Sequence, residues 1–186
     1  MSKTRERLVK LILSAVMIAL SIAMTRLLPQ EMVLALFGQT PLTVRLGLGL
    51  IPVYFASMAL GPGWGAAVGG LADLLGYFVN PFGGAFFLPI TLAAALTAAI
   101  PGLVTGRFGR GFGSVACAVY AAGFSSCVIT TFLLEILLST PFFVLFWPRL
   151  VSMLIMNAVY VAVEYALLRA FGAMGALQKL RPLSKS

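Results

Sequence analysis

The sequence predicts an all-α membrane protein: a compact bundle of six transmembrane helices forming a single domain over residues 1–186, with both termini cytoplasmic. Hydrophobic residues make up 61% of the 186 residues and charged residues 10%, whereas soluble globular chains have roughly 45–50% and about 25%. So short a chain has too high a surface-to-volume ratio to bury that much apolar surface. Four long stretches also carry no charge. This argues against a soluble enzyme or a disordered chain. The uncharged stretches are residues 11–25, 46–72, 74–106 and 111–134.

Glycine and proline divide the apolar stretches, because proline cannot continue a helix and glycine permits a tight turn. A spanning helix needs roughly 17–25 residues. The first helix follows the basic N-terminus, the second ends at Gly61-Pro62-Gly63, and the third ends at residues 80–84. The fourth runs up to Arg107, the fifth ends at residues 139–141, and the sixth takes the last apolar stretch. The predicted helices cover about residues 8–28, 43–60, 63–79, 86–106, 112–139 and 146–171.

The basic residues predict the orientation of the bundle. They gather before the first helix, between the fourth and fifth, and after the sixth. With six spans, these groups share one side, which the positive-inside rule makes cytoplasmic. The net charge of +8 is then a topology signal and indicates the lipid bilayer, not nucleic acid, as the partner. The groups are Lys3, Arg5, Arg7 and Lys10; Arg107 and Arg110; and Arg169, Lys179, Arg181 and Lys185.

Residues suited to metal or ATP chemistry are scarce. The chain has no His, and its two cysteines, Cys117 and Cys127, lie ten residues apart on one predicted helix. Transition-metal sites favour His and Cys ligands, and P-loop ATPases need a glycine-rich phosphate loop that ends in Lys and Ser or Thr. We therefore expect no metal, no cofactor and no enzymatic activity.

Three arginines lie where this orientation disfavours them. Arg26, Arg45 and Arg149 fall at the predicted outer ends of the first, second and sixth helices, whereas Lys and Arg prefer the cytoplasmic side. One interpretation is that their long side chains snorkel to the outer headgroups. The other is an anion site, because a guanidinium can bind a carboxylate through two parallel hydrogen bonds.

Acidic residues inside the predicted helices indicate an internal polar site. A charge at mid-membrane costs roughly 2.5 kcal/mol or more and usually faces the bundle interior with a partner. Each acid belongs to a set spaced by three or four residues, which places the set on one helix face. The faces either surround one cavity or, for Asp73 and Glu135, pair with arginine and hold helices together. The sets are Gly65, Gly69, Asp73 and Tyr77; Cys127, Thr131 and Glu135; and Arg149, Met153, Asn157, Tyr160 and Glu164.

Small residues at four-residue spacing mark two further faces. Such faces let helices approach closely in lipid, either within the bundle or against another membrane protein. The two sets are Ala15, Ala19 and Ala23 in the first helix, and Gly61, Gly65 and Gly69 around the third.

Three segments resemble one family, the S components (substrate-binding subunits) of energy-coupling factor (ECF) vitamin transporters, and within it the folate-transporter group. Arg45–Pro81, RLGLGLIPVYFASMALGPGWGAAVGGLADLLGYFVNP, resembles the group's signature. Phe86–Gly106 resembles its fourth helix and Phe146–Val161, with its Pro-Arg pair, its sixth. Two places depart from the group: Ile129–Phe132 replaces Asn-Thr-Leu-Trp, and Phe87–Thr91 replaces Phe-Pro-Gly-Phe-Thr. The family is therefore more firmly indicated than folate.

The resemblance implies a subunit of an ATP-driven importer in the prokaryotic plasma membrane. Such a component binds a vitamin from outside, works with a transmembrane coupling subunit and two ATPase subunits, and topples within the bilayer. Residues 29–44 would form the outer lid, and residues 80–85, followed by Phe86 and Phe87, a second gate. The alanine steps of the first helix match the family's docking motif, which assigns partner docking to Ala15, Ala19 and Ala23.

A folate would suit these charges. Its glutamate tail needs cationic partners, and its pterin ring needs aromatic stacking and an acceptor such as Asp73 or Glu135. At about 100° per residue, Arg26 lies near the alanine face, so either the first helix bends near its end or Arg26 is not a ligand. The alternatives are an S component for another vitamin or a pterin- or deazapurine-like solute, and a small membrane scaffold protein. The predicted substrate-binding residues are Arg26, Arg45, Asp73, Phe87, Thr131, Glu135, Arg149 and Asn157.

Overall fold

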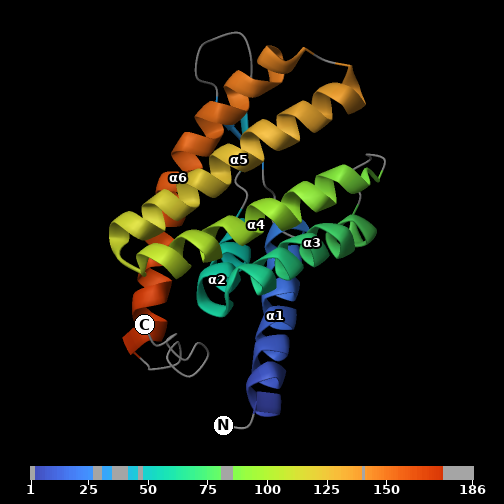
Figure 1. The fold of residues 1–186 in the computed structure, drawn as a ribbon. Coiled ribbons are helices and arrows are strands. Elements are labelled where there is room, and N and C mark those ends of the chain that lie inside the picture. The colour runs from blue at the N-terminus through green and yellow to red at the C-terminus, as the bar shows by residue number, and fades with distance from the viewer. Residues whose placement is uncertain are drawn as a thin grey trace.

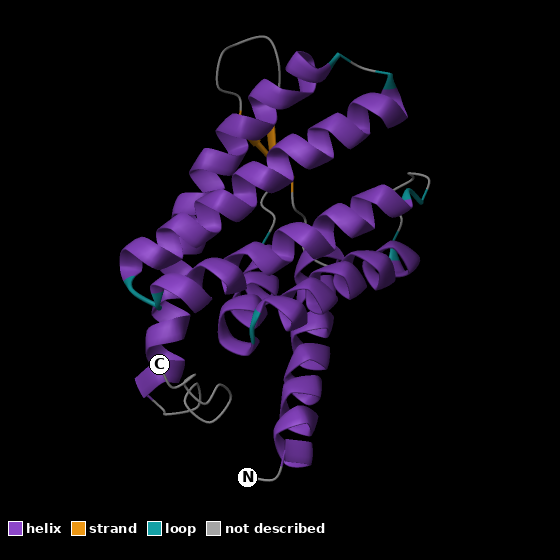
Figure 2. Ribbon diagram, viewed as in Figure 1, coloured by secondary structure: helices purple, strands orange, loops and turns teal. Residues whose placement is uncertain are grey.

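In the computed structural model, the described residues form six helices and one short pair of antiparallel strands, a β-hairpin (Figures 1 and 2). The structure describes residues 3–26, 31–34, 42–45, 48–80, 86–139 and 141–173. The helical body agrees with the predicted fold class, and the hairpin is an addition to it. The helices are α1 (Lys3–Arg26), α2 (Leu50–Leu60), α3 (Pro62–Val79), α4 (Leu88–Phe108), α5 (Phe112–Leu138) and α6 (Phe142–Ala173); the strands are β1 (Glu31–Leu34) and β2 (Leu42–Arg45).

Three predicted helix starts differ clearly from the observed ones. The first helix begins at Lys3 and not at residue 8. The second helix begins at Leu50 and not at residue 43, because residues 42–45 pair as a strand with β1, antiparallel, with Glu31 opposite Arg45. Thr43 and Val44 are β-branched and favour strands, and glycines at 47 and 49 weaken a helix there. The sixth helix begins at Phe142 and not at 146, so that Pro148 lies inside it.

The helices differ in whether they are long and apolar enough to cross a bilayer. Among the described residues, α1, α4, α5 and α6 are long and apolar enough to span a bilayer. With 11 residues, α2 is only about 16 Å long. The α3 helix has 18 residues and carries Asp73 in its middle. The count of six spans therefore stays a prediction.

The α2 helix is the centre of the molecule. All nine residues from Pro52 to Leu60 are buried, and the helix contacts α1, α3, α4 and α6. Its apolar character on every side, which gives no amphipathic face, is typical of a helix surrounded by protein.

A tight crossing joins α2, α3 and α4. The backbone N–H of Gly102 donates to Ser57 Oγ at 2.9 Å, and a Cβ at Gly65 would lie 2.4 Å from Ser57 Cβ. Gly61 has φ +112°, a left-handed conformation that glycine adopts without strain and that turns the chain from α2 into α3. The predicted glycine face around α3 therefore packs inside the bundle.

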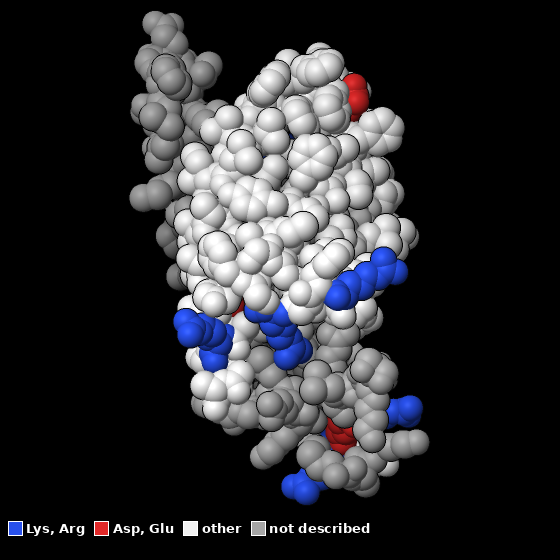
Figure 3. Space-filling model, turned by 60° about the vertical axis from the view of Figure 1, so that its left-hand side comes forward, with Lys and Arg blue, Asp and Glu red and all other residues white. Residues whose placement is uncertain are grey.

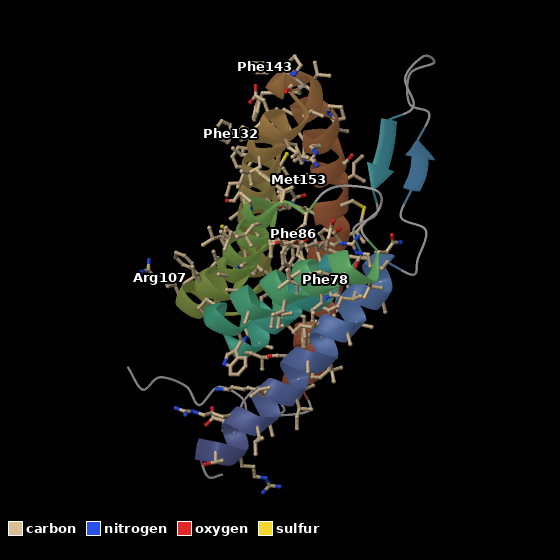
Figure 4. The ribbon with its side chains drawn as sticks, turned by 90° about the vertical axis from the view of Figure 1, so that its right-hand side faces the viewer. Phe78, Phe86, Arg107, Phe132, Phe143 and Met153 are labelled. Carbon is tan, nitrogen blue, oxygen red and sulfur yellow. The ribbon has the colours of Figure 1, made fainter. Side chains whose placement is uncertain are left out.

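The basic side chains gather toward one end. On the face drawn in Figure 3, Lys and Arg lie in the lower part of the molecule, where α1 begins and α6 ends in Figure 1. Arg110 donates to the carbonyl of Met58 near the C-terminal end of α2 at 3.1 Å, and Arg107 extends away from the bundle (Figure 4). The arrangement fits the predicted orientation, which stays a prediction.

Candidate functional site

A cavity of about 570 Å³ lies between the C-terminal half of α5 and the N-terminal half of α6, with α2 contributing to its wall. This volume is within the usual range for small-molecule sites, about 300–1,000 Å³. Met153 lies between α5 and α6 in Figure 4 and is one of the lining residues. The strand β2 also lies against α6. The polar and aromatic residues in its lining include Arg149, Asn157, Thr130, Ser126, Tyr54 and Tyr160.

Two threonines of α5 orient the Arg149 guanidinium. Arg149 Nη1 donates to Thr130 Oγ1 at 3.2 Å and to Thr131 Oγ1 at 3.5 Å. Each hydroxyl donates its own hydrogen to the carbonyl four residues earlier, that of Ser126 or Cys127, which leaves its lone pairs to accept from arginine. The two threonine hydroxyls thus help to fix the guanidinium at the cavity wall.

One face of α6 supplies much of the cavity wall. Arg149, Met153, Asn157 and Tyr160 all line the cavity, as their spacing predicted. Asn157 is 2% exposed. The ring of Tyr160 meets that of Tyr54 from α2 edge to face, with centroids 6.1 Å apart. Glu164 continues this face, but it is fully buried and is not part of the cavity wall.

A smaller cavity of about 220 Å³ adjoins the first and is bordered by α1, α2, α3, α4 and α5. Arg26 and Asp73 contribute opposite charges to its wall. The two cavities share a wall, because four residues line both of them. These are Leu50, Tyr54, Ser126 and Thr130.

The end of α1 is attached to the bundle through Arg26. Arg26 Nη1 donates to the carbonyl of Asn80 at the end of α3, and its guanidinium lies against Gly76, where a Cβ would be 3.1 Å from Nε. Asp73 Oδ2 accepts a hydrogen bond from Thr91 of α4 at 2.7 Å. Polar groups of three helices therefore meet in this region.

The alanine face of α1 and the Arg26 side chain do not have to point in the same direction. Ala15 and Ala19 are exposed and Ala23 is half-buried, while the long Arg26 side chain reaches across to α3. The helix is continuous to Arg26. A small-residue surface and an arginine at the smaller cavity therefore coexist on one helix.

The remaining predicted residues lie elsewhere. Thr131 is fully buried behind the cavity wall and reaches the cavity only through Arg149. Glu135 and Phe87 are half-buried and are not among the residues that line either cavity. Arg45 is placed in β2, but its side chain lies outside the described residues. Residues 81–85 of the predicted second gate, and most of the predicted lid, also lie outside them.

The lining residues that were missed from the sequence include Tyr54, Ser126 and Thr130. Tyr54 was missed because α2 has no polar face to indicate which side meets a cavity. Ser126 and Thr130 lie one turn apart on α5, and Thr130 stands in the segment that departs from the folate group's pattern. That departure from the folate group's pattern was the feature of the sequence that could have indicated Thr130 as a lining residue. Among the described residues no His, Cys, Asp and Glu cluster could hold a metal ion.

Comparison with known proteins gives two matches that cover nearly the whole chain. Residues 9–175 match the sequence profile of a family described as ECF transporter, substrate-specific component. The folate transporter FolT of Clostridium novyi (strain NT) is 32% identical over 179 residues, which make up 94% of this chain and 96% of that relative.

Proposed function

Because this chain belongs to the substrate-specific components of ECF transporters, we propose that it captures an anionic, ring-containing vitamin, with folates the first choice. The family is a transporter component and not an enzyme. The vitamin is taken from outside the plasma membrane and imported with a transmembrane coupling subunit and two ATPase subunits. The docking surface on α1 is Ala15, Ala19 and Ala23.

The observation that best supports an anionic substrate is the position of Arg149 at the wall of the larger cavity. Two threonine hydroxyls orient its guanidinium at that wall, and a cation in this position suits a ligand carboxylate. Bidentate pairing of this kind adds both strength and geometric selectivity. The adjacent Tyr54 and Tyr160 rings offer apolar surface for an aromatic ligand.

The smaller cavity supports a second polar contact. Asp73 is an acceptor at its wall, and the amino-pyrimidine edge of a pterin is a donor. Of the two acids predicted for this role, Asp73 is favoured, because Glu135 is not among the residues that line the cavities. The shared wall allows one elongated ligand to extend from Arg149 toward Asp73.

Thr130 favours one alternative. It lines both cavities and belongs to the segment that departs from the folate group's pattern. A different vitamin, or a pterin- or deazapurine-like solute, is therefore the second candidate. A membrane scaffold protein needs no cavity of this size and no cation at its wall.

Two measurements test the proposal. Mass spectrometry of small molecules that co-purify with the protein identifies the ligand directly. Calorimetric titration compares the binding of folic acid with that of a neutral vitamin, riboflavin. We expect tight binding of the folate and none of riboflavin. Tight binding of riboflavin that is indifferent to Arg149 would overturn the anion site.

A further inference from the structure

A glycine of α5 packs directly against the amide of Asn157. Gly123 is buried, and a Cβ built on it would lie 2.3 Å from Asn157 Nδ2 and 2.9 Å from Oδ1. These separations are well inside van der Waals contact, which for heavy atoms is about 3.5–4.0 Å. The Asn157 side chain can therefore occupy its position only while residue 123 has no side chain.

The amide of Asn157 retains hydrogen-bonding capacity for a ligand. Its Nδ2 donates to Met153 Sδ at 3.0 Å, and a thioether is a weak acceptor. A carboxamide has two donor hydrogens and two acceptor lone pairs. Both Asn157 and Gly123 line the larger cavity, so the unused capacity lies at a surface that a ligand can reach.

The clash falls at the wall of the cavity. Gly123 and Asn157 both line it, so a methyl group at residue 123 would displace the amide from the position in which it faces a ligand.

The distance from Asn157 to Arg149 suits an elongated ligand. The two residues are eight positions apart on α6, about 12 Å along the helix axis. A carboxamide pairs well with a heterocycle edge that has a donor next to an acceptor, as Asn does with adenine. A ligand with an anionic group at Arg149 can present such a ring edge to Asn157.

We propose that Gly123 is a positioning residue for substrate specificity: its missing side chain holds the Asn157 amide at the cavity wall, where the amide binds the ligand's ring edge. This inference rests on the proposed function for the identity of the ligand. The steric relation between Gly123 and Asn157 does not depend on that identity.

A double-mutant cycle on the full-length protein tests the proposal. Folic acid affinity is measured for the wild type, Gly123→Ala, Asn157→Ala and the double variant. We expect each single variant to bind roughly tenfold more weakly, and the double variant to bind no more weakly than Asn157→Ala. Gly113→Ala is the matched control, because it lies on the same helix with no atom within 4 Å of the added Cβ, and it should bind like the wild type.

Thermal unfolding gives a second readout without ligand. Gly123→Ala should lower the Tm when Asn157 is present and have little effect in the Asn157→Ala background, where the added methyl group finds room. Full affinity in Gly123→Ala, or additive losses in the double variant, would overturn the inference. If the wild type and Gly113→Ala both fail to bind folic acid, the folate assignment of the proposed function is wrong, while the Tm cycle still decides the steric relation.

Discussion

At the scale of single residues, Arg149 is the group whose removal should matter most. Loss of one partner from a desolvated charge pair costs roughly 2–5 kcal/mol, about 30- to several-thousand-fold in affinity. We expect Arg149→Ala to weaken folic acid binding by that factor in calorimetry. Arg107→Ala should not weaken it, because Arg107 extends away from the bundle (Figure 4). Equal affinities for the two variants would remove Arg149 from the site.

The hydroxyl of Thr130 should matter through Arg149. Thr130→Val keeps the shape of the side chain but removes the acceptor of the 3.2 Å hydrogen bond. A hydrogen bond to a charged group contributes about 1.5–3 kcal/mol, so we expect affinity to fall about 10- to 150-fold. Thr130→Ser keeps the hydroxyl and should retain most of the affinity. If the serine variant binds as poorly as the valine variant, the hydroxyl is not what orients the arginine.

Helical spacing predicted part of the site and missed the rest for a physical reason. The α6 face from Arg149 to Tyr160 could be predicted because one helix fixes the relative directions of its own side chains. Which residues of α5 meet that face depends on how the two helices pack, which spacing within one helix does not determine. Glu135 was therefore predicted at the cavity, whereas Thr130 lines it.

At the scale of elements, the crossing of α2, α3 and α4 should be sensitive to volume. Gly65→Ala would bring a methyl group to 2.4 Å from Ser57 Cβ and 2.8 Å from the carbonyl of Ala98. Overpacking of a tight core typically costs about 1–3 kcal/mol, so the Tm in detergent should fall. Gly63→Ala on the same helix has no atom within 4 Å of its Cβ and serves as the control. A Gly65→Ala Tm equal to that of the control would show that the crossing can relax.

The exposed alanines of α1 lead to a prediction about partner docking. Ala19→Trp should abolish energised uptake and leave substrate binding to the isolated protein nearly unchanged, because a bulky side chain prevents close approach of a partner helix. Leu96→Trp is the control, since Leu96 is exposed on α4, away from that face. Uptake assays in cells with the complete transporter make the comparison, and normal uptake by Ala19→Trp would refute the docking assignment.

Helices could be predicted from the sequence where an apolar stretch is bounded by breaks, but apolarity did not distinguish a strand from a helix. The breaks around residues 61–63, 80–84 and 139–141 came from proline and glycine and separate the observed helices. Residues 43–45 were assigned to the start of a helix because an apolar stretch follows them, and apolarity alone does not tell a strand from a buried helix. Pairing with β1, a contact between separate segments, determines their conformation.

At the scale of the whole molecule, the orientation can be tested by accessibility. In a background with Cys117 and Cys127 replaced by alanine, a cysteine at Phe108 should react only with reagents that enter the cytoplasm. A cysteine at Phe143, which is 71% exposed near the start of α6, should react from outside. Labelling of residue 108 by an impermeant reagent in intact cells would contradict the six-span topology.

The central position of α2 bears on how the protein matches its bilayer. Hydrophobic mismatch acts only on surface that touches lipid, and from Pro52 to Leu60 this helix is buried in protein. Its shortness therefore imposes no thinning on the membrane. The thickness that the protein prefers is determined by the longer outer helices α1, α4, α5 and α6. The central helix can thus shorten or lengthen in evolution without moving the protein to a different membrane.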